Sequence, residues 1–114
     1  AQAPHVAVLE GRVVGMYKMG PNFPDLGAHV ASATYVVDAA ARGRGVGRAL
    51  VEHSLERARA EGFLAMQFNY VVSTNGPAVA LYRKLGFAVV GTLPEAFQHG
   101  QRGLVDVFVM HRFL

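Results

Sequence analysis

The stretch Arg42-Gly43-Arg44-Gly45-Val46-Gly47 decides the fold of this chain, because it joins a valine-rich run ending at Asp38 to an amphipathic pattern of helical period. Glycine permits positive φ and close approach of the backbone. A turn that opens a helix directs several N–H groups, together with the positive end of the helix dipole, at one point. Arg42, Arg44 and Arg48 add cations for phosphate oxygens. We therefore predict a phosphate-binding strand-loop-helix unit; the alternative is a tight turn that binds nothing.

The glycine spacing excludes two common nucleotide-binding loops. A nucleoside triphosphate loop ends in Gly-Lys followed by Ser or Thr, and no lysine follows these glycines. A dinucleotide fingerprint has two residues between its second and third glycines, whereas Gly45 and Gly47 are separated by one. The phosphate ligand must therefore be of another class.

On the N-terminal side of the loop, three strands are expected. His5–Glu10 and Arg12–Lys18 are Val-rich runs on either side of Gly11, which indicates an antiparallel hairpin. Residues 19–27 concentrate Gly, Pro, Asn and Asp, and predict the only long loop. His29–Asp38 predicts the third strand because it is rich in β-branched residues.

On the C-terminal side, two helices alternate with strands. Val46–Glu61 has apolar residues at helical spacing and ends before Gly62. Phe63–Val72 predicts a strand, and a second helix begins at Ser73–Pro77 and ends at Gly86. Two further strands, Phe87–Gly91 and Leu104–Arg112, flank a polar loop. The order predicts one α+β domain over residues 1–114.

Composition limits the classes of function. The 114 residues are 52% hydrophobic and 17% charged, as in one globular domain. The net charge of +3 is dispersed, which argues against nucleic acid, and the short apolar runs argue against a membrane span. We expect a cytoplasmic protein. The absence of cysteine excludes an acyl-cysteine intermediate, and the five dispersed histidines predict no metal site.

Two motifs carry a resemblance to a known family. The glycine loop resembles the [QR]-x-x-G-x-[GA] loop of the GNAT superfamily of acyl-CoA N-acetyltransferases, and Asn75 with Leu81–Phe87 is similar to its second signature, an Asn followed by a helix ending L-Y-x-K-x-G-F. The resemblance implies a mixed, mostly antiparallel sheet with splayed central strands flanked by helices. The family normally has a strand and one or two helices before the hairpin, so we expect an N-terminally truncated domain.

The resemblance implies coenzyme A binding, with acetyl-CoA as co-substrate. Its diphosphate would bind the glycine loop, and its pantetheine arm would pair with backbone of the third strand. The residues so implied are Tyr35, Val36, Val37, Arg42, Gly43, Arg44, Gly45, Val46, Gly47, Arg48, Asn75 and Tyr82. A backbone N–H would polarise the thioester carbonyl, and the acetyl group would pass directly to a primary or secondary amine of a small molecule, such as an amino acid or analogue. The alternative function is a non-catalytic acyl-CoA-binding module.

Tyr82 and Asn75 each have a structural and a functional interpretation. Tyr82 stands where the family often places the acid that protonates the departing thiolate, but it also belongs to the apolar stripe of Ala78 and Leu81. Asn75 is a helix cap by its position before Gly76-Pro77, and the family adds a coenzyme contact there. These roles stay open at this point.

Asn69 lies inside an apolar run, where an inward-pointing amide needs partners. The stretch Phe68–Asn75 resembles the branch that acetylates azetidine-2-carboxylate and related proline analogues, in which the matching Asn lies at the reaction centre. That branch holds the acceptor carboxylate with a second Asn, and Ser32 stands in its place here. We therefore name Asn69 as a candidate catalytic residue, and Asn69 with Ser32 as candidate acceptor contacts.

Two expectations concern the rest of the surface. Loss of the family's first elements would uncover apolar sheet, so we expect a homodimer. Glu10 and His29 are possible bases acting through water, but polar strand residues more often face solvent, and no general base is assigned.

Overall fold

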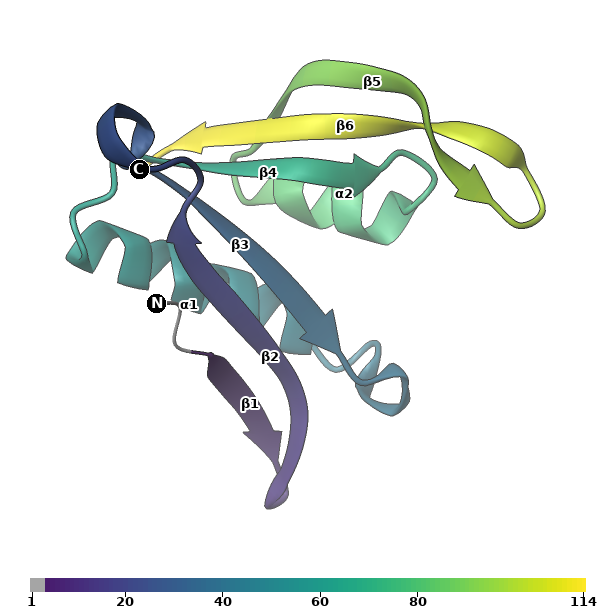
Figure 1. The fold of residues 1–114 in the computed structure, drawn as a ribbon. Helices are drawn as coiled ribbons and strands as arrows, with labels where there is room; N and C mark the ends of the chain where they lie inside the picture. Colours follow the sequence, from purple (N-terminus) through teal and green to yellow (C-terminus); the bar gives the residue numbers. More distant parts are fainter. Residues whose placement is uncertain (1–3) are drawn as a thin grey trace. The chain divides into compact units, whose positions relative to one another are not determined.

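The computed structural model describes residues 4–114 and contains six strands, two α-helices and two short 3-10 turns (Figure 1). The strands are β1 (His5–Leu9), β2 (Arg12–Pro21), β3 (Val30–Val37), β4 (Ala65–Val72), β5 (Ala88–His99) and β6 (Gly103–Phe113). The helices are α1 (Val46–Ala60) and α2 (Gly76–Lys84), and the turns are η1 (Asp25–Gly27) and η2 (Ala39–Ala41). The hydrogen-bonded strand order is β1-β2-β3-β4-β6-β5. The predicted order of strands and helices and the mixed, mostly antiparallel sheet are confirmed.

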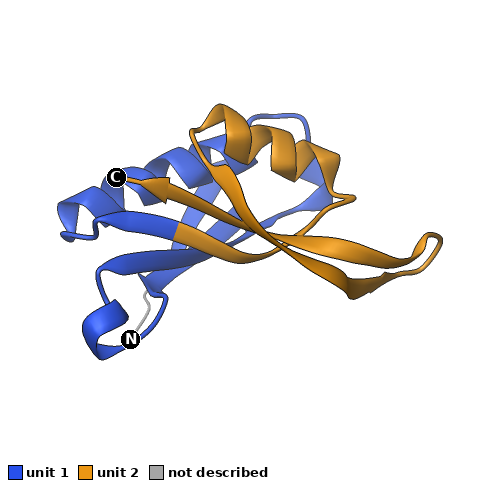
Figure 2. Ribbon diagram, turned by 90° about the horizontal axis from the view of Figure 1, so that it is seen from above, with its two compact units in different colours: residues 1–66, 114 blue, residues 67–113 orange. Residues whose placement is uncertain are grey.

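The chain forms two compact units, which Figure 2 colours separately. Unit 1 ends at Met66 and also includes Leu114. Unit 2 is Gln67–Phe113. Between Pro4 and Leu114, neither α-helix is long and apolar enough to cross a bilayer.

Unit 1 is built on the hairpin of β1 and β2. Leu9 pairs with Arg12, so the turn consists of Glu10 and Gly11, with φ of 53° and 77°. Positive φ at both central residues is the turn geometry that suits the twist of a hairpin. β3 then pairs antiparallel with β2 from Gly15–Val37 to Pro21–Ala31. The expected hairpin and third strand are therefore confirmed.

Helix α1 covers one face of this sheet (Figure 1). Tyr17 is fully buried beneath it, and its hydroxyl lies 2.6 Å from Nδ1 of His53. The hydroxyl of Tyr35 lies 2.6 Å from Oγ of Ser54, which itself donates to Val51 O at 2.7 Å. The apolar stripe that predicted the helix is the buried one, comprising Val46, Leu50, Val51, Leu55 and Ala58.

Gly15 allows this helix to approach the sheet. A Cβ added there would stand 3.0 Å from Cδ1 of Leu50, from Cγ1 of Val46 and from the carbonyl oxygen of Val36. Two of these atoms belong to the first turns of α1, and the third is backbone that side-chain rotation cannot move. The absence of a side chain at Gly15 therefore allows helix α1, which follows the glycine loop, to pack closely against the sheet.

We expect Gly15→Ala to lower the free energy of unfolding by about 1–3 kcal/mol, because overpacking forces neighbouring groups apart. Urea denaturation of the two proteins measures the difference. The matched control is Gly100→Ala, since an added Cβ at Gly100 meets nothing within 4 Å. Equal stabilities of Gly15→Ala and the parent protein would contradict this packing argument.

Two of the predicted loops are wrong in extent. β2 continues to Pro21, so residues 19–21 of the predicted loop are strand, because Gly20 and Pro21 pair with Ser32 and Ala31. In unit 2, β5 and β6 form one long hairpin joined by residues 100–102 only. The predicted polar loop between residues 91 and 104 is therefore mostly strand, since cross-strand pairing overrides the local composition.

A bulge explains how β5 accommodates its proline. Leu93 pairs with Val107 and Phe97 pairs with Val105, so Pro94, Glu95 and Ala96 stand opposite one residue, Asp106. Glu95 N–H donates to the carboxylate of Asp106 at 3.0 Å, and the Tyr70 hydroxyl donates to Ala96 O at 2.7 Å. Side chains thus take over hydrogen bonds that the ladder loses at the bulge.

Candidate functional site

The loop between β3 and α1 is shaped by two glycines in the left-handed region. Gly43 has a φ of 80° and Gly45, the N-cap of α1, has a φ of 76°. An added Cβ at either residue would meet nothing within 4 Å. Glycine is therefore needed here for backbone conformation and not for space, since L side chains rarely adopt these angles.

The N-terminus of α1 presents backbone donors. The first intrahelical bond runs from Ala49 N–H to Gly45 O at 3.0 Å, and no side chain caps the helix. The N–H groups of Val46, Gly47 and Arg48 therefore have no acceptor within the helix. With the helix dipole they form a positive end that suits an anion.

Three arginines, Arg42, Arg44 and Arg48, lie in the loop and the first turn of α1, and all are exposed. Arg44 lies 3.8 Å from Oε1 of Glu10, and Arg48 lies 3.4 Å from Oε1 of Glu52. Within residues 4–114, the Arg42 guanidinium has no ion-pair partner. The predicted cations thus lie in or next to the predicted loop, and one of them has no carboxylate partner within residues 4–114.

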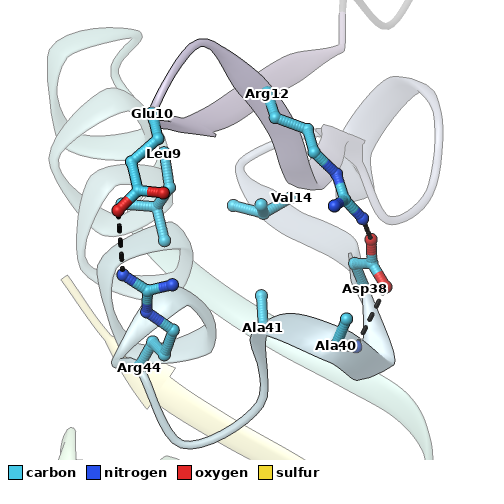
Figure 3. Close-up of a pocket in the computed structure, with 8 residues that line it drawn as sticks. All are labelled: Leu9, Glu10, Arg12, Val14, Asp38, Ala40, Ala41 and Arg44. Carbon is cyan, nitrogen blue, oxygen red and sulfur yellow. Dashed lines mark hydrogen bonds and ion pairs between the residues drawn. The ribbon is translucent and has the colours of Figure 1, made fainter.

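A cavity of about 130 Å³ lies beside the loop (Figure 3). On one side Glu10 points toward Arg44, and on the other Arg12 donates to Asp38 at 3.0 Å. Asp38 also caps η2 by accepting from Ala40 N–H at 3.0 Å. This backbone hydrogen bond and, after it, the Arg12 guanidinium lower the pKa of the Asp38 carboxyl below its ordinary value. The lining residues are Leu9, Glu10, Arg12, Val14, Asp38, Ala40, Ala41 and Arg44.

The backbone of β3 is directed alternately to its two edges. Asp38 N–H donates to Val14 O at 2.8 Å on the β2 side, and Leu64 N–H donates to His29 O at 2.8 Å on the other. Even-numbered residues of β3 therefore face β2, and the N–H groups of Ala33 and Val37 point to the opposite edge. Pairing with β4 covers Val30–Ala65 and Ala31–Met66.

Of the residues predicted on β3, Tyr35 contacts helix α1 through its side chain, which reaches Ser54 and, at 3.7 Å, the sulfur of Met66. Val36 is exposed, and Val37 is half-buried. Ser32 is half-buried opposite Gly20. The Tyr35 phenol is thus a packing group, and any coenzyme contact from this position would come from its backbone.

In unit 2, Tyr82 belongs to an aromatic cluster. Its ring centroid lies 4.6 Å from that of Phe68 and 6.0 Å from that of Phe87. Phe87 N–H donates to Tyr82 O at 2.9 Å where Gly86, with φ of 93°, ends the helix. Burial raises the pKa of the Tyr82 phenol above its ordinary value of 10.0, so the hydroxyl keeps its proton at neutral pH.

Asn75 and Asn69 differ in their surroundings. Asn75 is the N-cap of α2 and accepts from Ala78 N–H at 3.3 Å, as its position before Gly76-Pro77 predicts. Asn69 is exposed, and its Oδ1 accepts from the side-chain amide of Gln67 at 2.9 Å. The condition stated for an inward-pointing amide therefore does not apply to Asn69, because its side chain is one of those that the run leaves exposed.

Two polar contacts were missed by sequence reasoning. Arg112 donates to Leu85 O at 2.6 Å and so caps the C-terminus of α2, and Arg12 pairs with Asp38. The partners in each pair are more than 25 residues apart in the chain, so no local spacing identifies them. Within residues 4–114, no cluster of three His, Cys, Asp or Glu side chains is placed to hold a metal ion.

The family of this chain follows from comparison with known proteins. A solved GCN5-related N-acetyltransferase from Kribbella flavida is 55% identical with a TM-score of 0.97 over 99% of this chain and 68% of that one. A Salmonella typhimurium protein solved with its cofactor acetyl-CoA is 26% identical with a TM-score of 0.87 over 99% of this chain and 65% of that one. An L-methionine sulfoximine/L-methionine sulfone acetyltransferase from Pseudomonas paraeruginosa is 35% identical over 87% of this chain and 58% of its own length.

This chain matches only 14%, 47% and 28% of the lengths of three further curated relatives. It therefore spans less than half of each of them. A family model described as the acetyltransferase (GNAT) family matches residues 1–87. Both signature segments, the glycine loop and Leu81–Phe87, lie inside that range. The chain therefore belongs to the GNAT family of acetyltransferases.

Proposed function

We propose that this chain is an acetyl-CoA-dependent N-acetyltransferase that passes an acetyl group directly to a primary or secondary amine of a small molecule. The observation that carries the proposal is the loop from Arg42 to Gly47. It combines two left-handed glycines, a helix N-terminus without a side-chain cap and exposed arginines. A diphosphate needs just such a set of donors and cations. Family membership supports the coenzyme as the source of that diphosphate.

In this proposal the coenzyme diphosphate accepts from the N–H groups of Val46, Gly47 and Arg48. Arg42 and Arg44 add charge-assisted bonds, and Gly43 and Gly45 hold the loop open to it. The pantetheine arm runs along the β3 segment Tyr35–Val37, where alternate residues direct backbone groups away from β2. Asn75 contacts the coenzyme in addition to its role as helix cap.

The proposed reaction is a direct acyl transfer. The nitrogen lone pair of the neutral amine attacks the thioester carbonyl, whose oxygen is held by a backbone N–H of β3 as negative charge develops. The tetrahedral species then expels the coenzyme thiolate, and the amine loses a proton to water. Tyr82 donates its phenolic proton to the thiolate and is reprotonated from solvent. The chain holds no cysteine, so no acyl-cysteine step takes part.

For the acceptor we propose an amino acid or a close analogue. The relative from Pseudomonas paraeruginosa is named for acetylating two amino-acid analogues, methionine sulfoximine and methionine sulfone. On this chain, Asn69 offers an exposed amide that is bonded to the half-buried Gln67, and Ser32 offers a hydroxyl on β3. Amide and hydroxyl groups can form hydrogen bonds with the carboxylate and the amine of such an acceptor. Within this class, we propose a proline analogue as the more specific acceptor.

The competing function is a non-catalytic module that binds acyl-CoA. The two functions differ in turnover and agree in binding. A panel of amino acids, proline analogues, other small amines and short peptides is incubated with acetyl-CoA and the protein, and N-acetylated products are identified by mass spectrometry. We expect product from the amino-acid group; binding of acetyl-CoA with no product from any amine would favour the module.

We also propose that the protein acts in the cytoplasm as a homodimer. Val6, Val13 and Val36 are each 57% exposed and line a shallow cavity of about 240 Å³ in unit 1 with Met16. A second copy of this face would cover these apolar groups. We expect a dimer by sedimentation velocity and a monomer after Val36→Lys. A parent protein that sediments only as a monomer at high concentration would contradict the dimer.

A further inference from the structure

Two ion pairs lie on either side of the 130 Å³ cavity, and one of them joins the turn of the β1–β2 hairpin to the glycine loop (Figure 3). Arg12 and Asp38 form the first at 3.0 Å, and Glu10 and Arg44 form the second at 3.8 Å. All four side chains line the cavity. The hairpin turn therefore faces Arg44, one of the arginines to which the proposed function assigns the coenzyme diphosphate.

The two pairs differ in how firmly they are held. Asp38 has a second donor, the Ala40 N–H at 3.0 Å, so it is held in place by the turn that it caps. The Glu10 side chain is 84% exposed and makes the longer contact. Arg44 is also more than half exposed. The Glu10–Arg44 pair is thus the one that a ligand can open without disturbing the loop.

The backbone conformation of Glu10 is unusual for a glutamate. Its φ is 53°, in the left-handed region that favours Gly, Asn or Asp over Glu. The preceding strand and Gly11 impose this two-residue turn, and its geometry directs a carboxylate at the phosphate-binding loop (Figure 3). A polar but uncharged residue would complete the same turn without opposing an anion.

We propose that Glu10 competes with the coenzyme diphosphate for Arg44 and thereby weakens the binding of coenzyme A and its thioesters. This inference rests on the proposed function of the loop. Without ligand, the carboxylate neutralises Arg44. When the diphosphate binds, Arg44 turns to the phosphate oxygens, and Glu10 is left as an anion beside a second anion. The repulsion speeds release of the coenzyme A product. Glu10 therefore lowers the affinity for acetyl-CoA and, in the same way, raises the rate at which coenzyme A dissociates.

The test is calorimetric titration of Glu10→Gln with acetyl-CoA, alongside the parent protein. The exposed pair is weak, and the added repulsion acts over a short distance through water, so we expect binding about three- to tenfold tighter. The matched control is Glu56→Gln, which removes the same charge from an exposed position of α1 that forms no ion pair within residues 4–114. We expect its affinity to stay within about twofold of the parent's.

Two further measurements identify Arg44 and the diphosphate as the groups concerned. Glu10→Gln should also be made in a protein that already carries Arg44→Gln. There, the fold-increase in acetyl-CoA affinity that it causes should be less than half of the fold-increase in the parent. Acetyl-pantetheine carries the thioester without the diphosphate, so its binding should not respond to Glu10→Gln. A parent protein that binds no acetyl-CoA would refute the proposed function. A parent that binds while Glu10→Gln has unchanged or weaker affinity would overturn the competition alone.

Discussion

Replacing Arg42 and Arg44 together with alanine is expected to weaken acetyl-CoA binding by on the order of 100-fold or more. A hydrogen bond to a charged group contributes about 1.5–3 kcal/mol, and each 1.4 kcal/mol is tenfold in affinity. Arg42 has no ion pair within the described chain, and Arg44 has only the exposed contact with Glu10. In the free protein these arginines therefore make few contacts that coenzyme binding would have to break. The double variant should lose nearly all of the binding energy that the two arginines contribute.

Calorimetric titration measures this effect directly. The matched control is Arg57→Ala with Arg59→Ala, which removes two cations from the last turn of the same helix. Because that end of α1 is about 15 residues from the loop, we expect the control to weaken binding by less than about threefold at physiological salt. Equal losses in the two double variants would show that net charge, and not the loop, holds the coenzyme.

The second large effect is expected for Tyr82→Phe, which should lower kcat by about 100-fold, because a positioned acid contributes about 10²–10⁴-fold to a rate. Phenylalanine keeps the ring that packs against Phe68 and Phe87. The dissociation constant of acetyl-CoA should therefore change by less than about twofold. Tyr70→Phe is the matched control, since it removes an exposed hydroxyl bonded to Ala96 O in the same unit. An unchanged kcat in Tyr82→Phe would remove the assignment of Tyr82 as the acid.

The pKa of Tyr82 fixes the sign of the pH dependence. Burial favours the neutral phenol and raises its pKa above 10.0, so Tyr82 stays protonated through the neutral range. Ionisation of Tyr82 therefore causes no loss of kcat below about pH 10. The same shift stabilises the fold below the ordinary tyrosine pKa, and this contribution is lost as the pH rises through the raised value. A kcat that falls between pH 8 and 9 in the parent and equally in Tyr82→Phe would belong to another group.

The fold was predictable where local patterns coincide with tertiary ones. The apolar residues of α1 recur at helical spacing and are the residues that the sheet buries, and Asn75 caps α2 as its neighbours indicate. The long β5–β6 hairpin was not predictable, because Pro94 and the polar residues around it read as a loop. Its strands are held by pairing across the hairpin, and Tyr70 of β4 and Asp106 of β6 form hydrogen bonds with the bulge that follows Pro94.

The candidate site divides in the same way. The glycine loop is contiguous in sequence, and its conformation was expected from Gly43 and Gly45 alone. The contacts of Glu10 with Arg44 and of Arg12 with Asp38 depend on how the hairpin turn meets the loop, which no spacing in the sequence reveals. The exposure of Asn69 likewise depends on which side chains of β4 are covered. The arginines and glycines of the loop were predicted from the sequence. Their carboxylate partners, such as Glu10 for Arg44, became apparent only in the structure.

The central claim, acetyl transfer from the coenzyme to an amine, is tested most directly by following coenzyme A release with and without the amine found in the product screen. The account predicts that release depends on the amine and that one N-acetylated product forms for each coenzyme A released. Release that is independent of any amine, or binding of acetyl-CoA without release, would contradict it.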